Sequence, residues 1–103
     1  MGGGMIYEKI DDISMNYEKD GKQLVKELKK EILSRGVWVT ILYLYQQLNE
    51  RNGEYREPKI CIRRYKKVKG FYQQQSKFTF SSDKQAKLIA DTINKWVALY
   101  GSI

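Results

Sequence analysis

The chain has 103 residues and a formal net charge of +7, from 19 Lys and Arg against 12 Asp and Glu. This length predicts one domain with a single modest core. One cysteine and no histidine exclude a disulfide framework and a Cys/His metal site, so we expect an intracellular protein without metal or cofactor. Because no apolar run is long enough to span a membrane, we expect a cytoplasmic or nucleoid-associated location.

The first 19 residues predict a tag remnant followed by a weakly ordered arm. The opening MGGGM is typical of an expression-tag scar before a native Met5. Residues 6–19 place isoleucines at helical spacing, but acidic and amide side chains interrupt the pattern, so an arm and a helix are both open. Residues 20–103 are expected to form the single domain.

The segment KQLVKELKKEIL, within residues 22–34, predicts an amphipathic helix of about four turns. Apolar side chains recur at helical intervals from Leu24 to Ile32. Asp20 fits the N-cap of such a helix, and Gly36 fits the position just past its end.

Residues 37–48, VWVTILYLYQQL, carry no charge and are rich in β-branched and aromatic side chains, which predicts a strand. Odd and even positions are both apolar, so each face of this strand should be covered. One small sheet with two helices covers both faces only partly, so we expect a homo-oligomer, most simply a C2 dimer. Trp38, Leu99 and Tyr100 are candidate contacts. An N-terminal helix that covers the second face alone is the open alternative.

Two further strands and a second helix complete the predicted order. An Asn-Gly turn at 52–53 precedes the strands at 59–68 and 71–80, which flank a tight Lys-Gly turn at 69–70. Residues 82–85 have capping-box spacing, and apolar residues then recur at helical intervals. The expected fold is α+β: an N-terminal helix, an antiparallel meander of three or four strands, and a C-terminal helix packed on one sheet face.

The basic residues are concentrated in one part of the chain. Residues 58–77 contain seven of the 19 cations and none of the 12 anions, so the remainder is neutral in sum. Such a concentration is typical of a surface that binds a polyanion. The alternative interpretation is a solvated basic face.

We expect the helices to cover the sheet face that carries Ile60, Ile62, Phe78 and Phe80, and the opposite face to bind the ligand. Cations there would contact phosphates, aromatic rings would stack on bases, and amides would reach base edges. The candidate nucleic-acid-binding residues are Lys59, Arg63, Tyr65, Lys67, Lys69, Gln73, Gln75, Lys77, Tyr43 and Tyr45. If Tyr65 instead belongs to the core, the face assignment is inverted and Arg64 and Lys66 take the binding role. A duplex would hide its bases from such a surface, so we expect sequence-tolerant binding of single-stranded DNA or RNA, with DNA favoured, by a protein that is not an enzyme.

Residues 37–97, with the elements "strand, NG turn, PKICIRRYKKVKG, QSKFTFSS, amphipathic helix", resemble the positive cofactor four family of single-strand-binding transcriptional coactivators. They are also similar to the ThermoDBP-related single-stranded DNA-binding proteins of archaea, which place a helix before the sheet. The resemblance implies homo-oligomers and binding through the sheet, at the matching positions Arg63, Tyr65, Lys67 and Lys77. Two features depart from the coactivator pattern: the strand region before the IxIR motif is shorter, and the expected helix at 22–34 is extra.

Two functions of other classes compete with this interpretation. A small toxin-like ribonuclease could act through Arg, Lys and Tyr on a basic sheet, with Glu57 and Arg64 as its candidate site, although solvated charges are the simpler interpretation of both. An adaptor for an acidic protein would use the cations but not the tyrosines. Cys61 is most simply a small strand residue, because no histidine is present to activate it.

Overall fold

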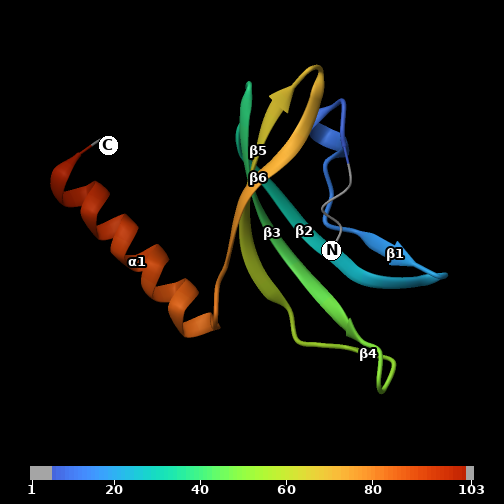
Figure 1. The fold of residues 1–103 in the computed structure, drawn as a ribbon. Coiled ribbons are helices and arrows are strands. Elements are labelled where there is room, and N and C mark those ends of the chain that lie inside the picture. The colour runs from blue at the N-terminus through green and yellow to red at the C-terminus, as the bar shows by residue number, and fades with distance from the viewer. Residues whose placement is uncertain (1–5, 102–103) are drawn as a thin grey trace.

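The computed structural model describes residues 6–101, so the predicted tag remnant at residues 1–5 lies outside the described part. The elements are η1 (Ile10–Asp12), β1 (Tyr17–Lys19), β2 (Lys22–Ser34), β3 (Trp38–Asn49), β4 (Glu54–Tyr55), β5 (Lys59–Val68), β6 (Phe71–Thr79) and α1 (Asp83–Tyr100). Strands pair in the order β1-β2-β3-β5-β6, with β4 beside β3. All pairs are antiparallel, and Figure 1 shows a curled sheet with α1 standing apart.

The predicted helix at residues 22–34 is wrong, because this segment is the long strand β2. Val25 and Ile32 are seven residues apart. In a helix this spacing places two residues on the same face, whereas in a regular strand it places them on opposite faces. Leu28 is a bulge residue. Glu27 pairs with Tyr45 and Lys29 pairs with the next residue, Leu44, so Leu28 between them has no partner. The extra residue resets the alternation, so Val25 and Ile32 reach the same face of the strand.

The predicted count of three or four strands is also wrong, because the sheet has six. Strand β2 pairs with β1 and β3, so the uncharged β3 lies between β2 and β5 in the middle of the sheet. The backbone groups of β3 are therefore satisfied on both sides, which a position at the edge would not provide. The expected antiparallel sheet itself is confirmed.

Two tight turns set the register of the hairpins. Lys69 and Gly70 join β5 to β6 with φ angles of 53° and 87°, as a two-residue hairpin turn requires. Asp20 and Gly21 join β1 to β2 with φ angles of 54° and 79°. Asp20 is therefore a turn residue, and its predicted role as a helix N-cap is wrong.

The core lies between the sheet and the segment that precedes β1, which we call the N-terminal strap (residues 6–16). Ile13 and Met15 of the strap are buried against tyrosines and aliphatic side chains of β2, β3, β5 and β6. Tyr7 forms a bridge with Tyr72 of β6, and the Ser14 hydroxyl donates to the Glu27 carboxylate of β2 at 3.0 Å. We call this covered side of the sheet the inner face and the opposite side the outer face.

Helix α1 does not pack on the sheet, so the expected arrangement is wrong. The predicted face assignment is wrong as well, because the strap covers the face of Cys61 and Tyr65 and the face of Ile60, Ile62 and Phe78 is the outer one. None of its residues is buried, and Figure 1 shows it directed away from the strands. Its N-cap, Ser82, has an extended backbone and accepts a hydrogen bond from the Gln85 amide at 3.1 Å. Because the backbone stays extended up to Ser82, the chain has already left the sheet when α1 begins at Asp83. Within residues 6–101, no helix is long and apolar enough to cross a membrane.

Candidate nucleic-acid interface

Three of the predicted binding cations meet at one end of the inner face. Arg63 of β5 and Lys77 of β6 are directly opposite each other in the register, and Lys59 of β5 is opposite Tyr45 of β3. Strand alternation places Lys59 and Arg63 on the same side as buried Cys61. We call the group Lys59, Arg63 and Lys77 the basic mouth.

The basic mouth opens into a pocket of about 220 Å³ between the strap and the sheet. Its lining is the three cations together with Met15, Val25, Tyr45, Gln47 and Thr79. The lining contains no acidic residue and offers hydroxyl and amide groups beside the cations. This composition suits an anion that bears several oxygen acceptors, such as a phosphate.

The guanidinium of Arg63 has few partners. Its Nη1 donates to Oε1 of Gln74 at 3.0 Å, and its buried Nε has no hydrogen-bond partner among the described residues. The single ion pair in the described part of the chain joins Arg35 to Asp11, well away from the mouth in sequence. Like charges opposite each other in an antiparallel pair destabilise a sheet. An anion that bridges Arg63 and Lys77 would remove this repulsion.

The three predicted stacking residues, Tyr43, Tyr45 and Tyr65, belong to the core. Their exposed fractions are 1%, 5% and 3%, and the hydroxyls of Tyr43 and Tyr65 are hydrogen-bonded at 3.1 Å. Burial raises the pKa of each of these phenols above its usual value. The rings thus have no open face to offer a base, although Tyr45 is one of the residues that line the mouth pocket.

The remaining predicted residues are distributed over the β5–β6 hairpin. Lys67 lies at the far end of β5, with its Nζ 5.7 Å from the centre of the Tyr72 ring. Lys69 lies in the hairpin turn. Gln73 is opposite Lys66 and shares the outer face with it, and Gln75 is the unpaired residue of a bulge in β6. The structure does not bring these side chains to the basic mouth.

An aromatic and basic cluster lies on the outer face and contains Arg64 and Lys66, the binding residues of the inverted face assignment, together with Trp38, which was not a predicted binding residue. The guanidinium of Arg64 lies 4.3 Å from the ring centre of Trp38, and Nζ of Lys66 lies 5.3 Å from it. Trp38 is 41% exposed, so its ring is accessible where the three tyrosines are not. The sequence signal was the doublets Arg63-Arg64 and Lys66-Lys67, because adjacent strand residues point to opposite faces.

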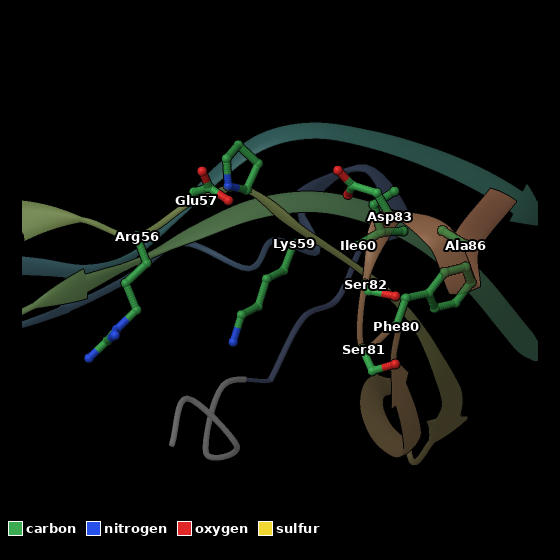
Figure 2. A pocket seen from close by; sticks show the side chains of 10 residues that line it. Arg56, Glu57, Lys59, Ile60, Phe80, Ser81, Ser82, Asp83 and Ala86 are labelled. Atoms are coloured by element: carbon green, nitrogen blue, oxygen red, sulfur yellow. The ribbon is translucent and has the colours of Figure 1, made fainter.

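A second hollow, of about 510 Å³, lies where α1 leaves the sheet. Figure 2 shows Arg56 and Lys59 on one part of its wall, and Ser82 and Asp83 near the start of the helix. Glu57 also lines it, so the hollow carries charges of both signs. This mixture makes it a weaker candidate for a polyanion than the basic mouth.

The candidate ribonuclease residues are far apart. Glu57 precedes β5, whereas Arg64 lies opposite Thr40 near the middle of the β3–β5 pair. Seven residues of extended chain separate them by roughly 23 Å, at about 3.3 Å per residue. Direct cooperation of their side chains on one scissile bond would need a separation of a few ångströms.

Comparisons with known proteins identify no relative. No protein-family model, no curated protein and no solved structure matches the chain. The resemblance to the positive cofactor four and ThermoDBP-related families stays a prediction that depends on the quoted motifs. The helix before the sheet, which favoured the ThermoDBP-related proteins, is the strand β2 in this chain. Function is therefore argued from the site alone.

Proposed function

We propose that the chain binds single-stranded nucleic acid, with single-stranded DNA favoured, by placing backbone phosphates in the basic mouth. The observation that carries this proposal is the Arg63–Lys77 cross-strand pair, two cations in register beside Lys59 and an acid-free pocket. An unliganded sheet gains nothing from this pairing. A phosphate that bridges the two side chains would convert the repulsion into charge-assisted hydrogen bonds.

The shape of the site favours a flexible strand over a duplex. The mouth is recessed between the strap and the sheet, so a phosphate must enter a pocket of about 220 Å³ to reach Arg63. Duplex DNA is stiff over about 150 bp and presents its phosphates on a convex surface. A single strand can bend its backbone into the recess, and cations further along β5, such as Lys67, can contact the next phosphates.

The binding is proposed to be tolerant of sequence. The described mouth offers charges that contact phosphates, and such contacts carry no base information. Any stacking would come from an exposed ring such as Trp38 on the outer face. Stacking contributes about 1–3 kcal/mol per base whatever the base is.

The proposal includes the predicted homo-oligomer and a location inside the cell, where nucleic acid is present. It assigns no catalytic residue. The chain would then act as a binding module, in the cytoplasm or at the nucleoid.

Titration of fluorescent dT and rU oligomers, each as a single strand and as a duplex, tests the proposal. We expect tighter binding to the single strand than to the duplex of the same sequence. The same RNA, run on a gel after incubation, should stay intact. Cleaved RNA would favour the ribonuclease, and an absence of binding to every oligomer would overturn the proposal.

A further inference from the structure

We propose that α1 docks on the outer face of the sheet of a second copy of this chain, and that the two copies exchange helices reciprocally. The inference rests on the proposed homo-oligomer and is independent of nucleic-acid binding. Two surfaces of the same chain carry it: an apolar stripe on the helix and an apolar ladder on the sheet.

The helix has an amphipathic pattern with no partner. Its apolar stripe consists of residues that recur at intervals of three and four: Ala86, Ile89, Ala90, Ile93, Trp96, Val97 and Tyr100. Ile93 is 51% exposed and Trp96 is 55% exposed. Most stability of a helix in a protein comes from packing its apolar face, so a helix of this kind normally has a neighbour.

The sheet offers a matching surface in three adjacent strands. Leu44, Ile60 and Phe80 form one apolar row across β3, β5 and the end of β6, and Leu42, Ile62 and Phe78 form the next. We call these six residues the apolar ladder.

The apolar ladder is hollowed as well as exposed. A groove of about 530 Å³ has Leu42, Leu44 and Ile60 in its apolar wall and Lys29, Lys30 and Glu31 of β2 at its other side. The rings of Phe78 and Phe80 are 5.3 Å apart, and Phe78 is 50% exposed. A contiguous apolar patch of this kind marks an interaction site on a soluble domain.

The charges divide the outer face and define where the helix can lie. The cations Arg64 and Lys66 lie beyond the apolar ladder, toward Trp38. On β2 the two rows end at charged residues, Lys29 opposite Leu44 and Glu31 opposite Leu42. The polar side of α1 carries Lys84, Lys87 and Lys95. A helix docked through its apolar stripe on the ladder keeps these lysines in solvent and away from Arg64.

A second copy fits better than the chain's own sheet. The extended Ser82 directs α1 away from the strand that it follows. Only the start of the stripe, Ala86, borders a hollow that Ile60 and Phe80 of the same chain's ladder also line, and no residue of the helix is buried. Reciprocal exchange about a twofold axis satisfies both surfaces of both copies and closes the assembly.

The contact area is adequate for a dimer. A helix of 18 residues is about 27 Å long and covers a strip about 10 Å wide. Two such contacts, counted on both surfaces, remove on the order of 1,000 Å² from solvent, which is the lower limit of a specific interface.

Light scattering and two variants test the exchange. The unaltered chain should have twice the 12.2 kDa mass of one copy. Ile93→Asp with Trp96→Asp places charges in the stripe, and Phe78→Asp places one in the ladder. Each variant alone should be a monomer with an unchanged strand signal in circular dichroism. Leu88→Asp is the control, because Leu88 is exposed about 140° around the helix from Ile93 and should leave the dimer intact.

Mixing the two monomeric variants distinguishes exchange from other dimers. The Phe78→Asp chain has an intact helix and the helix variant has an intact sheet, so one contact is repaired in the mixture. The mixture should therefore associate more strongly than either variant alone and more weakly than the unaltered chain. A dimer that forms through helix–helix packing would survive Phe78→Asp. A Phe78→Asp chain that stays dimeric, or a mixture that does not associate, would overturn the exchange. An unaltered chain of 12.2 kDa at micromolar concentration would overturn it too, whereas nucleic-acid binding by such a monomer would leave the proposed binding function standing.

Discussion

The proposed phosphate site rests on the Arg63–Lys77 pair, whose like charges are unfavourable in the unliganded chain. Two cations opposite each other on the inner face repel in the unliganded chain, and neither forms an ion pair among the described residues. A structural role would favour one cation and one anion at these positions. Binding and stability should therefore respond in opposite directions to the loss of either charge.

Lys77→Gln should weaken binding of a single-stranded oligomer. The slope of log affinity against log salt concentration should become less negative by roughly 0.7, which corresponds to the loss of one phosphate contact. The same change should leave the unliganded chain as stable as before or slightly more stable, because it removes a repulsion. Oligomer titration at several salt concentrations measures the first effect, and urea unfolding measures the second. Lys87→Gln on the exposed side of α1 is the matched control and should change neither. Reduced stability with normal binding would assign Lys77 to the fold.

Tyr65 was predicted to stack on bases, but it is a core residue. Tyr65→Ala should reduce the free energy of unfolding by about 3–5 kcal/mol, as truncation of a buried aromatic ring does. Tyr65→Phe should cost about 1 kcal/mol, because it removes only the hydrogen bond to the Tyr43 hydroxyl. Urea unfolding of both variants checks this order. A stable Tyr65→Ala protein that binds DNA weakly would restore the stacking interpretation.

The buried tyrosines should make the fold sensitive to alkali. Burial, and then the neighbouring Tyr65, raise the pKa of Tyr43, and burial raises the pKa of Tyr65. The folded chain therefore keeps these protons where the unfolded chain, with a tyrosine pKa of about 10, releases them. Stability should be full below that pH and fall as the pH rises beyond about 10. Urea midpoints at increasing pH measure the fall, and Tyr43→Phe should make it shallower. Midpoints that do not change up to pH 11 would contradict the burial of these phenols.

At the scale of elements, local signals predicted the C-terminal half of the sheet and failed at β2. The Lys69-Gly70 turn and the charge-free β3 are short-range features, and both strands beside the turn were expected with nearly their observed bounds. In β2 the alternation is interrupted by the Leu28 bulge, which imitates a helical repeat. Pairing with β3 is a long-range interaction and overrides the helix propensity of the Lys and Glu residues.

Gly21→Ala distinguishes the strand from the helix that the sequence suggested. In the β1–β2 turn, Gly21 has a φ of 79°, so an alanine there should destabilise the chain by about 1 kcal/mol. At the start of a helix the same change would stabilise the chain. Gly21→Asn is the control and should cost less, because asparagine tolerates this conformation. Thermal unfolding gives the sign, and a stabilised Gly21→Ala chain would contradict β2.

For the candidate binding site, the sequence predicted which strands carry the cations but not which face of the sheet is covered. The sequence located the cations on β5 and β6, but the doublets Arg63-Arg64 and Lys66-Lys67 put a cation on each face. Choosing a face required knowing which one is covered. The strap covers the inner face with Ile13, and α1 leaves the outer face open, neither of which is encoded in a local pattern.

At the scale of the whole molecule, the strap and the helix use the two faces differently. The strap closes one part of the inner face and leaves the basic mouth at the other end, where Lys59 and Lys77 border solvent. The outer face divides into an apolar ladder, proposed for the partner's helix, and the cluster around Trp38. A dimer built by exchange would leave both mouths free, so one strand of nucleic acid could contact each copy.

The salt dependence of oligomer binding tests the central claim most directly. If Lys59, Arg63, Lys67 and Lys77 each contact a phosphate, the affinity for a single-stranded dT oligomer should fall with a log–log slope of about −3. Combined loss of Arg63 and Lys77, as glutamines, should reduce the slope to about −1.5. A slope near zero in the unaltered chain, or one unchanged by the double substitution, would contradict phosphate binding in the basic mouth.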